Sequence, residues 1–273
     1  MNLVSSAAPT DVADQAKAPP GPVKRTGAPP AVDSESRLID DTLASWTLEQ
    51  TVASLVMITY PGTDPAPARA ALNAHGFGGF LLMGTNTGAP LDATAAFVGG
   101  LSADPLLPVL TAVDQEGGDV RRLPGDGAAA GRELHGAAPV TVEDAFAARS
   151  ALVDEAGIAV NFGVVADVTA DANAFILRRV LDTAPPAAAE RVAGAVRGED
   201  GRALSTLKHF PGHGASPDDS HVSVPASGIS LAEWRATHAL PFAAGIEAGA
   251  ELVMTGHLRF DAVSPHPASL SPT

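Results

Sequence analysis

Three histidines, a lysine and two aspartates lie within the short segment Lys208–His221. The segment reads Lys-His-Phe-Pro-Gly-His-Gly from position 208 and Asp-Ser-His from position 219. Its prolines and glycines predict a shaped loop after residue 210. His221 follows Asp219 by two residues, and a hydrogen bond between the carboxylate and the imidazole would fix the tautomer of the ring. Such a pair suits a general acid/base that works near neutral pH.

Two other interpretations of this segment compete with the acid/base pair. The first is a solvated polar loop without chemistry. The second is a zinc site formed by His209, His213 and His221. The zinc interpretation is the weaker of the two, because no His-Glu-x-x-His motif places the ligands on a helix and no further carboxylates are placed to orient them.

Polar, titratable residues also follow several predicted strands directly. The runs in question begin at Asp114, Asp167, Lys208 and His257. The carboxyl ends of parallel strands carry the active site in barrel enzymes, and in an open doubly wound sheet they form a binding crevice. The sequence contains no Gly-x-Gly-x-x-Gly or Gly-x-x-x-x-Gly-Lys motif, so nucleotide binding has no support.

Short apolar runs alternate with Ala-rich segments of helical character, which predicts a parallel sheet that is buried on both faces. The predicted strands are Val56–Thr59, Gly79–Met83, Val109–Val113, Ala159–Val165, Leu204–Lys208 and Leu252–Thr255. The predicted helices are Ala66–Ala74, Val142–Glu155, Ala187–Arg197 and Leu231–Ala248, with an earlier helix capped by Ser45 or Thr47. A (β/α) barrel of about 250 residues would nearly fill a chain of 273 residues.

Composition limits the classes of partner. The formal net charge is −14, which disfavours nucleic acid and an anionic membrane surface. No apolar run is long enough to cross a bilayer. The absence of cysteine excludes disulfides, thiolate metal sites and a cysteine nucleophile.

The first part of the chain differs in character from the rest. Residues 1–36 are rich in Pro and Ala, and we expect a disordered tail or linker followed by one globular domain over residues 37–273. The first residues have no basic region followed by a long apolar run, so we expect no signal peptide in the sequence as given. Linkers of this kind often tether exported domains, so an extracytoplasmic location is slightly favoured, although the sequence does not fix the compartment.

The motif at 208–221 resembles the signature of glycoside hydrolase family 3, in its β-N-acetylhexosaminidase branch. Four other stretches resemble the same branch in the same order: Gly78–Leu82, Val113–Gly118, Val165–Val168 and Met254–His257. The similarity covers roughly residues 43–273 and implies a TIM-type (β/α)8 barrel, of which about six strands are expected in this sequence. It also implies a retaining hydrolase that removes terminal β-linked N-acetylglucosamine-type residues, without a metal or organic cofactor, in cell-wall recycling or chitin breakdown.

The resemblance implies roles for individual residues. His221 matches the general acid/base, and Asp219 matches the residue that orients it. Five residues match substrate-binding positions, where carboxylates accept hydrogen bonds from sugar hydroxyls and cations donate them: Asp114, Arg122, Arg179, Lys208 and His209. Arg178 is a close competitor of Arg179 for its position.

The sequence departs from the family pattern in two places. Asp119 stands where the family usually has an arginine, which would weaken the binding of an anionic substrate. In addition, no aspartate matches the nucleophile that a retaining glycosidase needs. We therefore expect an incomplete barrel that is marginally stable, prone to association and weak or inactive as a catalyst. The alternatives are a β-glucosidase of the same family, a non-catalytic carbohydrate-binding protein and a metal-dependent hydrolase.

Overall fold

The computed structural model describes residues 34–104 and 106–272. The chain divides into two compact units, Met1–Ser45 and Trp46–Thr273. Within the described residues, the first unit consists of helix α1 (Ser34–Ser45). A disordered tail was predicted for residues 1–36, and positions 1–33 of it lie outside the described residues. Residues 34–36 belong to α1, so the prediction was wrong for these three.

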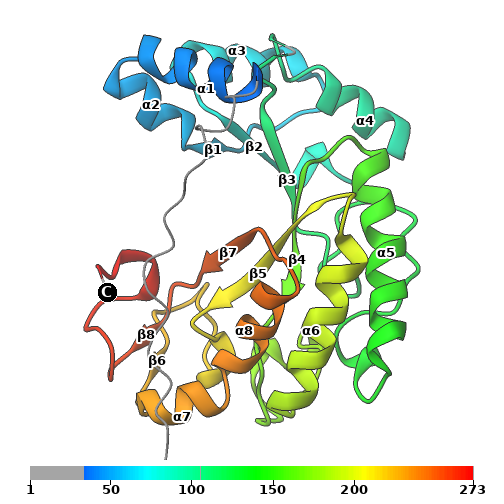
Figure 1. Cartoon of the computed structure of the whole chain (residues 1–273). Helices are drawn as coiled ribbons and strands as arrows, with labels where there is room; N and C mark the ends of the chain where they lie inside the picture. Colours follow the sequence, from blue (N-terminus) through cyan, green and yellow to red (C-terminus); the bar gives the residue numbers. More distant parts are fainter. Residues whose placement is uncertain (1–33, 105, 273) are drawn as a thin grey trace, which may run out of the picture. The chain divides into compact units, whose positions relative to one another are not determined.

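The second unit is built on a curled parallel sheet of six strands in the order β1-β2-β3-β4-β5-β7 (Figure 1). The strands are β1 (Met57–Ile58), β2 (Gly79–Leu82), β3 (Leu110–Val113), β4 (Val160–Val165), β5 (Leu204–Phe210) and β7 (Leu252–Thr255). A separate pair joins β6 (Ala226–Ser227) and β8 (Arg259–Phe260). The sheet forms a half-barrel, as expected of a TIM-type barrel with six of its eight strands.

Helices connect the parallel strands, because a parallel neighbour can be reached only by a crossover. They are α3 (Pro65–His75), α4 (Leu91–Gly99), α5 (Pro139–Glu155), α6 (Pro185–Glu199), α7 (Leu231–Ala236) and α8 (Ala239–Glu247). Helix α2 (Leu48–Ser54) precedes β1. The short 3₁₀ helices are η1 (Gly84–Asn86), η2 (Gly131–Leu134), η3 (Phe175–Arg178), η4 (His213–Ala215) and η5 (Ala268–Leu270).

Local sequence explains where two of the helices begin and end. Of the two caps considered for α2, Thr47 is the one used: its side chain accepts from the backbone N–H of Gln50, whose side chain accepts from the backbone N–H of Thr47. Helix α3 is capped by Asp64 and stops at Gly76, whose φ of 72° lies in the left-handed region that glycine adopts without steric cost.

The single helix predicted over Leu231–Ala248 is wrong, since the segment forms the two helices α7 and α8. A continuous helix would need a backbone N–H at position 241 to bond the carbonyl of Thr237, and Pro241 has none. Thr237 ends α7 with a non-helical backbone, and Pro241 lies in the first turn of α8, where its missing donor costs nothing.

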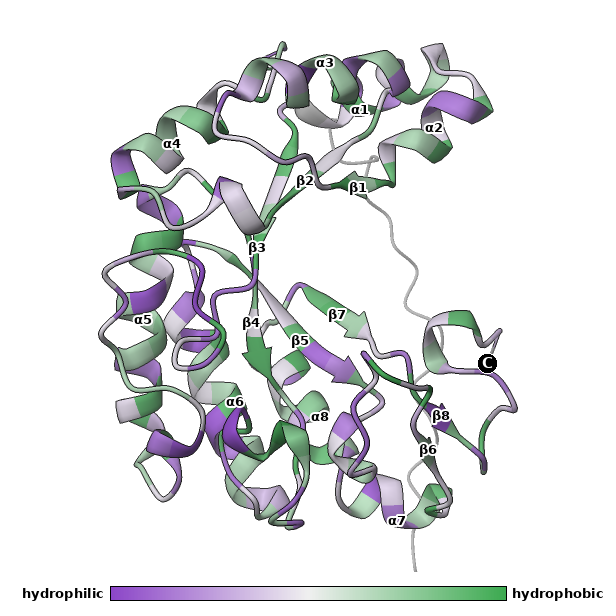
Figure 2. Cartoon of the chain, turned by 180° about the vertical axis from the view of Figure 1, so that it is seen from behind, coloured by the Kyte–Doolittle hydropathy of each residue, from purple (hydrophilic) through white to green (hydrophobic). Residues whose placement is uncertain are grey.

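The core lies between the sheet and its outer helices. Side chains of α5, α6 and α8 pack against β4 and β5 in one buried cluster that includes Phe146, Val164, Val192, Leu207 and Phe242. In Figure 2 strand β4 has hydrophobic colouring, whereas β5 is coloured hydrophilic toward its carboxyl end, where Lys208 lies. The outermost strands of this sheet are less buried: every residue of β1 and β7 is partly or largely exposed.

Candidate active site

A cavity of about 430 Å³ opens at the carboxyl ends of the strands. Six of the seven predicted site residues line it: Asp114, Arg122, Arg179, Lys208, His209 and His221. The seventh, Asp219, is bonded to His221 and does not itself line the cavity. The half-barrel brings these residues together because parallel strands end at the same edge of a sheet.

Lys208 lies at the centre of the site. It comes from the buried strand β5, and its side chain is only 2% exposed. The ammonium group donates to Asp114 Oδ1 at 2.8 Å and contacts Glu116 Oε1 at 2.5 Å, so two carboxylates balance one buried cation. Asp114 keeps its second carboxylate oxygen for another partner.

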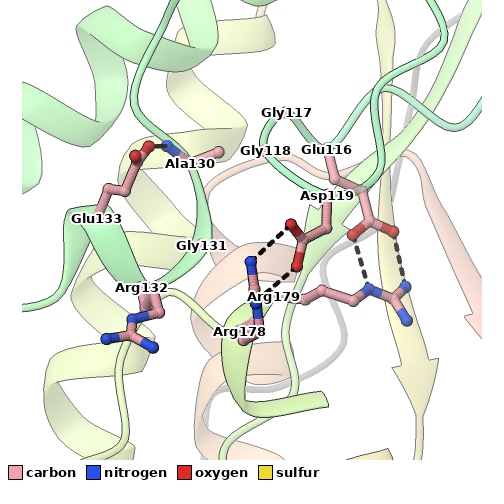
Figure 3. Close-up of a pocket in the computed structure, with 10 residues that line it drawn as sticks. All are labelled: Glu116, Gly117, Gly118, Asp119, Ala130, Gly131, Arg132, Glu133, Arg178 and Arg179. Atoms are coloured by element: carbon pink, nitrogen blue, oxygen red, sulfur yellow. Dashed lines mark hydrogen bonds and ion pairs between the residues drawn. The ribbon is translucent and has the colours of Figure 1, made fainter. Parts of the chain in front are cut away.

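Glu116 also binds Arg179, and Figure 3 shows the two parallel hydrogen bonds of this pair. Arg179 Nε donates to Oε2 at 2.9 Å and Nη2 donates to Oε1 at 2.7 Å. Burial would raise the pKa of the Glu116 carboxyl, but Lys208 and Arg179 outweigh it and hold that pKa below its ordinary value. The same buried pair raises the pKa of Arg179, although burial opposes the shift.

His209 connects this cluster to the end of β4. Its Nδ1 lies 2.6 Å from Asp167 Oδ2, and its Nε2 lies 3.2 Å from Arg179 Nη2. Both Asp167 oxygens also accept from backbone N–H groups, including that of His213 at 2.6 Å. The cation of Arg179 and the ring of His209 are thus held in fixed orientations beside the cavity.

Asp219 and His221 form the predicted pair. His221 Nδ1 lies 2.6 Å from Asp219 Oδ1, and the same oxygen accepts from the backbone N–H of His221 at 2.9 Å. The backbone hydrogen bond, followed by the side-chain hydrogen bond, lowers the pKa of Asp219. The His221 side chain is 79% exposed, so the pair lies on an open loop at the rim of the cavity.

The adjacent arginines Arg178 and Arg179 differ in burial and in the carboxylate that each binds. Arg179 is mostly buried and lines the main cavity, whereas Arg178 forms an exposed ion pair with Asp119 at 2.7 Å (Figure 3). That pair borders a second cavity of about 280 Å³, which also touches Glu116 and Arg179. The structure thus places Arg179, and not its competitor, in the predicted site. It also shows that the negative charge of Asp119 is matched by Arg178.

No group of three or more His, Asp or Glu side chains in the described part of the chain is arranged to hold a metal ion. The three histidines of the zinc interpretation differ in their surroundings. His209 and His221 each have Nδ1 bonded to an aspartate, and both ring nitrogens of His213 are buried. Among the described residues, no helix has the length and apolar character required to cross a membrane.

Sequence reasoning did not assign a site role to two residues that organise the cavity. Glu116 lies in the Asp-Gln-Glu run after β3, and alternation along an extended chain puts positions 114 and 116 on the same side. Asp167 was named among the polar residues at strand ends but was given no role in the site. Its position just after β4, the neighbour of the strand that carries Lys208 and His209, was the available signal.

Known proteins that are similar to this chain belong to one family. The profile described as the glycosyl hydrolase family 3 N-terminal domain matches residues 47–273. A beta-hexosaminidase of Xylella fastidiosa (strain 9a5c) is 35% identical over 175 residues, which cover 60% of this chain and 52% of the relative. A beta-hexosaminidase of Xanthomonas oryzae pv. oryzae (strain KACC10331 / KXO85) is 33% identical over 228 residues, covering 80% and 68%. The chain thus spans about half the length of the first of these curated relatives.

Solved structures are similar as well. A family 3 beta-N-acetylglucosaminidase from Paenibacillus sp. str. FPU-7 matches with a TM-score of 0.77 and 29% identity, covering 83% of this chain and 45% of that one. M tuberculosis LpqI matches with a TM-score of 0.73 and 29% identity, covering 84% and 68%. Because the profile covers nearly the whole second unit, and that unit carries the half-barrel with the cavity at its strand ends, the chain belongs to glycosyl hydrolase family 3.

Proposed function

We propose that this chain binds a terminal β-linked N-acetylhexosamine and supplies the acid/base for its hydrolysis. The observation that carries the proposal is the Asp219–His221 pair at the rim of a cavity lined by an aspartate, two arginines, a lysine and a second histidine. The names of its relatives, beta-hexosaminidase and beta-N-acetylglucosaminidase, support the same substrate class.

The chemistry follows from which atoms remain available. Asp219 occupies Nδ1 of His221, which leaves Nε2 to give a proton to the leaving oxygen and later to take one from water. The second oxygen of Asp114 can accept from a sugar hydroxyl, while Arg122 and Arg179 can donate to sugar oxygens. Open exposure of His221 suits a group that must reach the aglycone side of the bond.

The carboxylates that line the cavity are Asp114 and Glu116, and both contact Lys208. A carboxylate neutralised by an ammonium group is a poor nucleophile, and a retaining glycosidase needs a free one. We therefore propose that the 273 residues hold the sugar-binding and acid/base half of the mechanism. On this proposal the chain alone binds the sugar and turns over slowly.

Binding and turnover of the purified chain test this proposal separately. We expect N-acetylglucosamine to bind by isothermal titration calorimetry or ligand-observed NMR, and glucose to bind more weakly. Asp114→Asn should weaken N-acetylglucosamine binding about tenfold or more, because a neutral amide replaces a charged acceptor. Asp261→Asn is the matched control, since that aspartate pairs with Arg259 at the surface and does not line the cavity.

Turnover is measured with an aryl N-acetyl-β-glucosaminide, with the aryl β-glucoside beside it. A low rate that His221→Ala reduces about 100-fold or more supports the acid/base role. Glucoside turnover faster than N-acetylglucosaminide turnover would assign the chain to the β-glucosidase alternative. Sugar binding with a turnover rate unchanged by His221→Ala would identify a carbohydrate-binding protein. A turnover rate typical of whole enzymes would refute the proposal that these 273 residues lack the nucleophile.

A further inference from the structure

Asp167 is the most completely enclosed carboxylate beside the cavity. Its side chain is 0% exposed, and it lies two residues after the end of strand β4. Oδ1 accepts from the backbone N–H of His213 at 2.6 Å, and both oxygens lie 3.3 Å from the backbone nitrogen of His209. Oδ2 lies 2.6 Å from His209 Nδ1. One carboxylate therefore holds both the backbone and the ring of His209.

The partner on the other side of the ring determines which nitrogen carries the proton. Arg179 Nη2 lies 3.2 Å from His209 Nε2, and a guanidinium group has donors only. Nε2 must therefore accept, so Nδ1 carries the hydrogen and donates it to Asp167. The opposite tautomer would point an Nε2–H at an Arg179 N–H and leave Nδ1 facing a carboxylate with no hydrogen between them.

This arrangement defines which Arg179 hydrogens remain for a ligand. Nε and Nη2 are used by Glu116, and Nη2 is also used by His209. The two hydrogens of Nη1 have no partner among these contacts, and Arg179 lines the cavity. A fixed His209 ring therefore holds the guanidinium group beside the cavity with its Nη1 edge available to a ligand.

We propose that Asp167 is a positioning residue: by holding His209 in the Nδ1–H tautomer, it orients Arg179 toward the substrate. The His209 tautomer and its dependence on Asp167 do not require that the chain bind a sugar. The effect of Asp167 on ligand affinity, in contrast, rests on the proposed function. Asp167 does not touch the substrate in this proposal and acts only through His209 and Arg179.

The tautomer is measured by long-range ¹H–¹⁵N correlation NMR of the full chain with ¹⁵N-labelled histidine. His209→Gln identifies the signals of that ring by their loss. We expect the wild-type His209 signals to show a protonated Nδ1 and an unprotonated Nε2. A wild-type ring protonated at Nε2 overturns the proposal, and this result needs no variant at position 167 to fold.

Asp167→Asn tests whether the His209 tautomer depends on Asp167. Its amide group can donate to Nδ1, so we expect the ring to change to the Nε2–H tautomer and N-acetylglucosamine affinity to fall about tenfold. Asp219→Asn is the matched control, because it should change only the signals of His221. If Asp167→Asn does not fold, the wild-type spectrum and Arg179→Gln decide: Asp167 should still hold the Nδ1–H tautomer when Arg179 is replaced. A His209 ring that changes to Nε2–H in Arg179→Gln, or one that is unchanged in Asp167→Asn, contradicts the proposal.

If the tautomer behaves as expected while wild-type chain binds no N-acetylglucosamine, the positioning role of Asp167 stands and the proposed function fails. If the sugar binds and the tautomer is unaffected by Asp167→Asn, the proposed function stands and the positioning role of Asp167 fails. The two results are therefore distinguishable in one set of samples.

Discussion

Arg178 and Arg179 are neighbours whose guanidinium groups each bind a carboxylate of the same loop, and they differ in burial. The Arg179–Glu116 side chains are 15% and 5% exposed, whereas those of Arg178–Asp119 are 66% and 50% exposed. An exposed ion pair contributes little because water screens both charges, whereas one partner left alone in a buried pair costs several kcal/mol. The two pairs therefore offer a matched comparison at the scale of single residues.

Glu116→Gln should lower the free energy of unfolding by about 3–5 kcal/mol, because Lys208 and Arg179 would keep their buried charges after losing the carboxylate that both contact. Asp119→Asn should change it by less than about 1 kcal/mol. Urea unfolding followed by circular dichroism measures both. Equal losses in the two variants would show that the buried cluster does not depend on Glu116.

Helix α6 and strands β4 and β5 meet at a buried carboxyl group. Glu199, the last residue of α6, accepts from Asn161 Nδ2 at 2.5 Å and from Ser205 Oγ at 2.7 Å. Burial raises the pKa of Glu199 from its ordinary value of 4.5 to about 7, although the two hydrogen bonds oppose the shift. The folded chain thus keeps a proton there that the unfolded chain loses at lower pH.

The sign of the resulting pH effect follows from proton binding. Between pH 4.5 and 7 the folded state binds more protons at Glu199 than the unfolded state does, so this group makes stability fall as pH rises through that window. A shift of this size corresponds to at most about 3 kcal/mol. Glu199→Gln should remove that slope in urea unfolding curves recorded from pH 4.5 to 8.

Glu251→Gln is the control for this measurement, since Glu251 accepts from the backbone N–H of Ser205 but is itself exposed. It should keep most of the wild-type slope, because burial is the main cause of the raised pKa of Glu199 and the charge of Glu251 adds the least to it. A Glu199→Gln chain whose stability falls with pH as steeply as the wild type would show that the Glu199 carboxyl ionises at its ordinary pH when folded.

The elements were predictable from the sequence wherever their signals were local. All six strands of the sheet were predicted within two residues at each end, because buried parallel strands are continuous apolar runs between helical segments. The break between α7 and α8 was missed, although Pro241 marked it. Helix α4 and the β6–β8 pair were not predicted, since short elements of two to nine residues carry weak patterns.

The site was predictable as a set of residues but not as a network. The motif at 208–221 pointed to Asp219 and His221, whose pairing is local in sequence. The contact between Lys208 and Glu116 joins β5 to the loop after β3, and that between His209 and Asp167 joins β5 to the end of β4. Such contacts depend on strand order and register, which no local pattern specifies.

At the scale of the whole second unit, β1 and β7 each have a strand partner on one side only within the described sheet. An unpaired edge presents backbone donors and acceptors to other chains. Apolar side chains lie near the β7 edge: Val253 is 42% exposed and Ile246 on α8 is 57% exposed. A cavity of about 230 Å³ nearby is lined mainly by apolar groups, including Phe210, Trp234 and Phe260.

We therefore expect the purified chain to associate at micromolar concentrations, as measured by sedimentation velocity over a dilution series. Val253→Lys should shift the population toward monomer, because a lysine on an edge strand opposes pairing with a second edge. Val140→Lys is the matched control, since Val140 is 60% exposed on α5, away from the sheet edge. A wild-type chain that stays monomeric throughout would refute the association, and two variants that dissociate it equally would place it elsewhere than at β7.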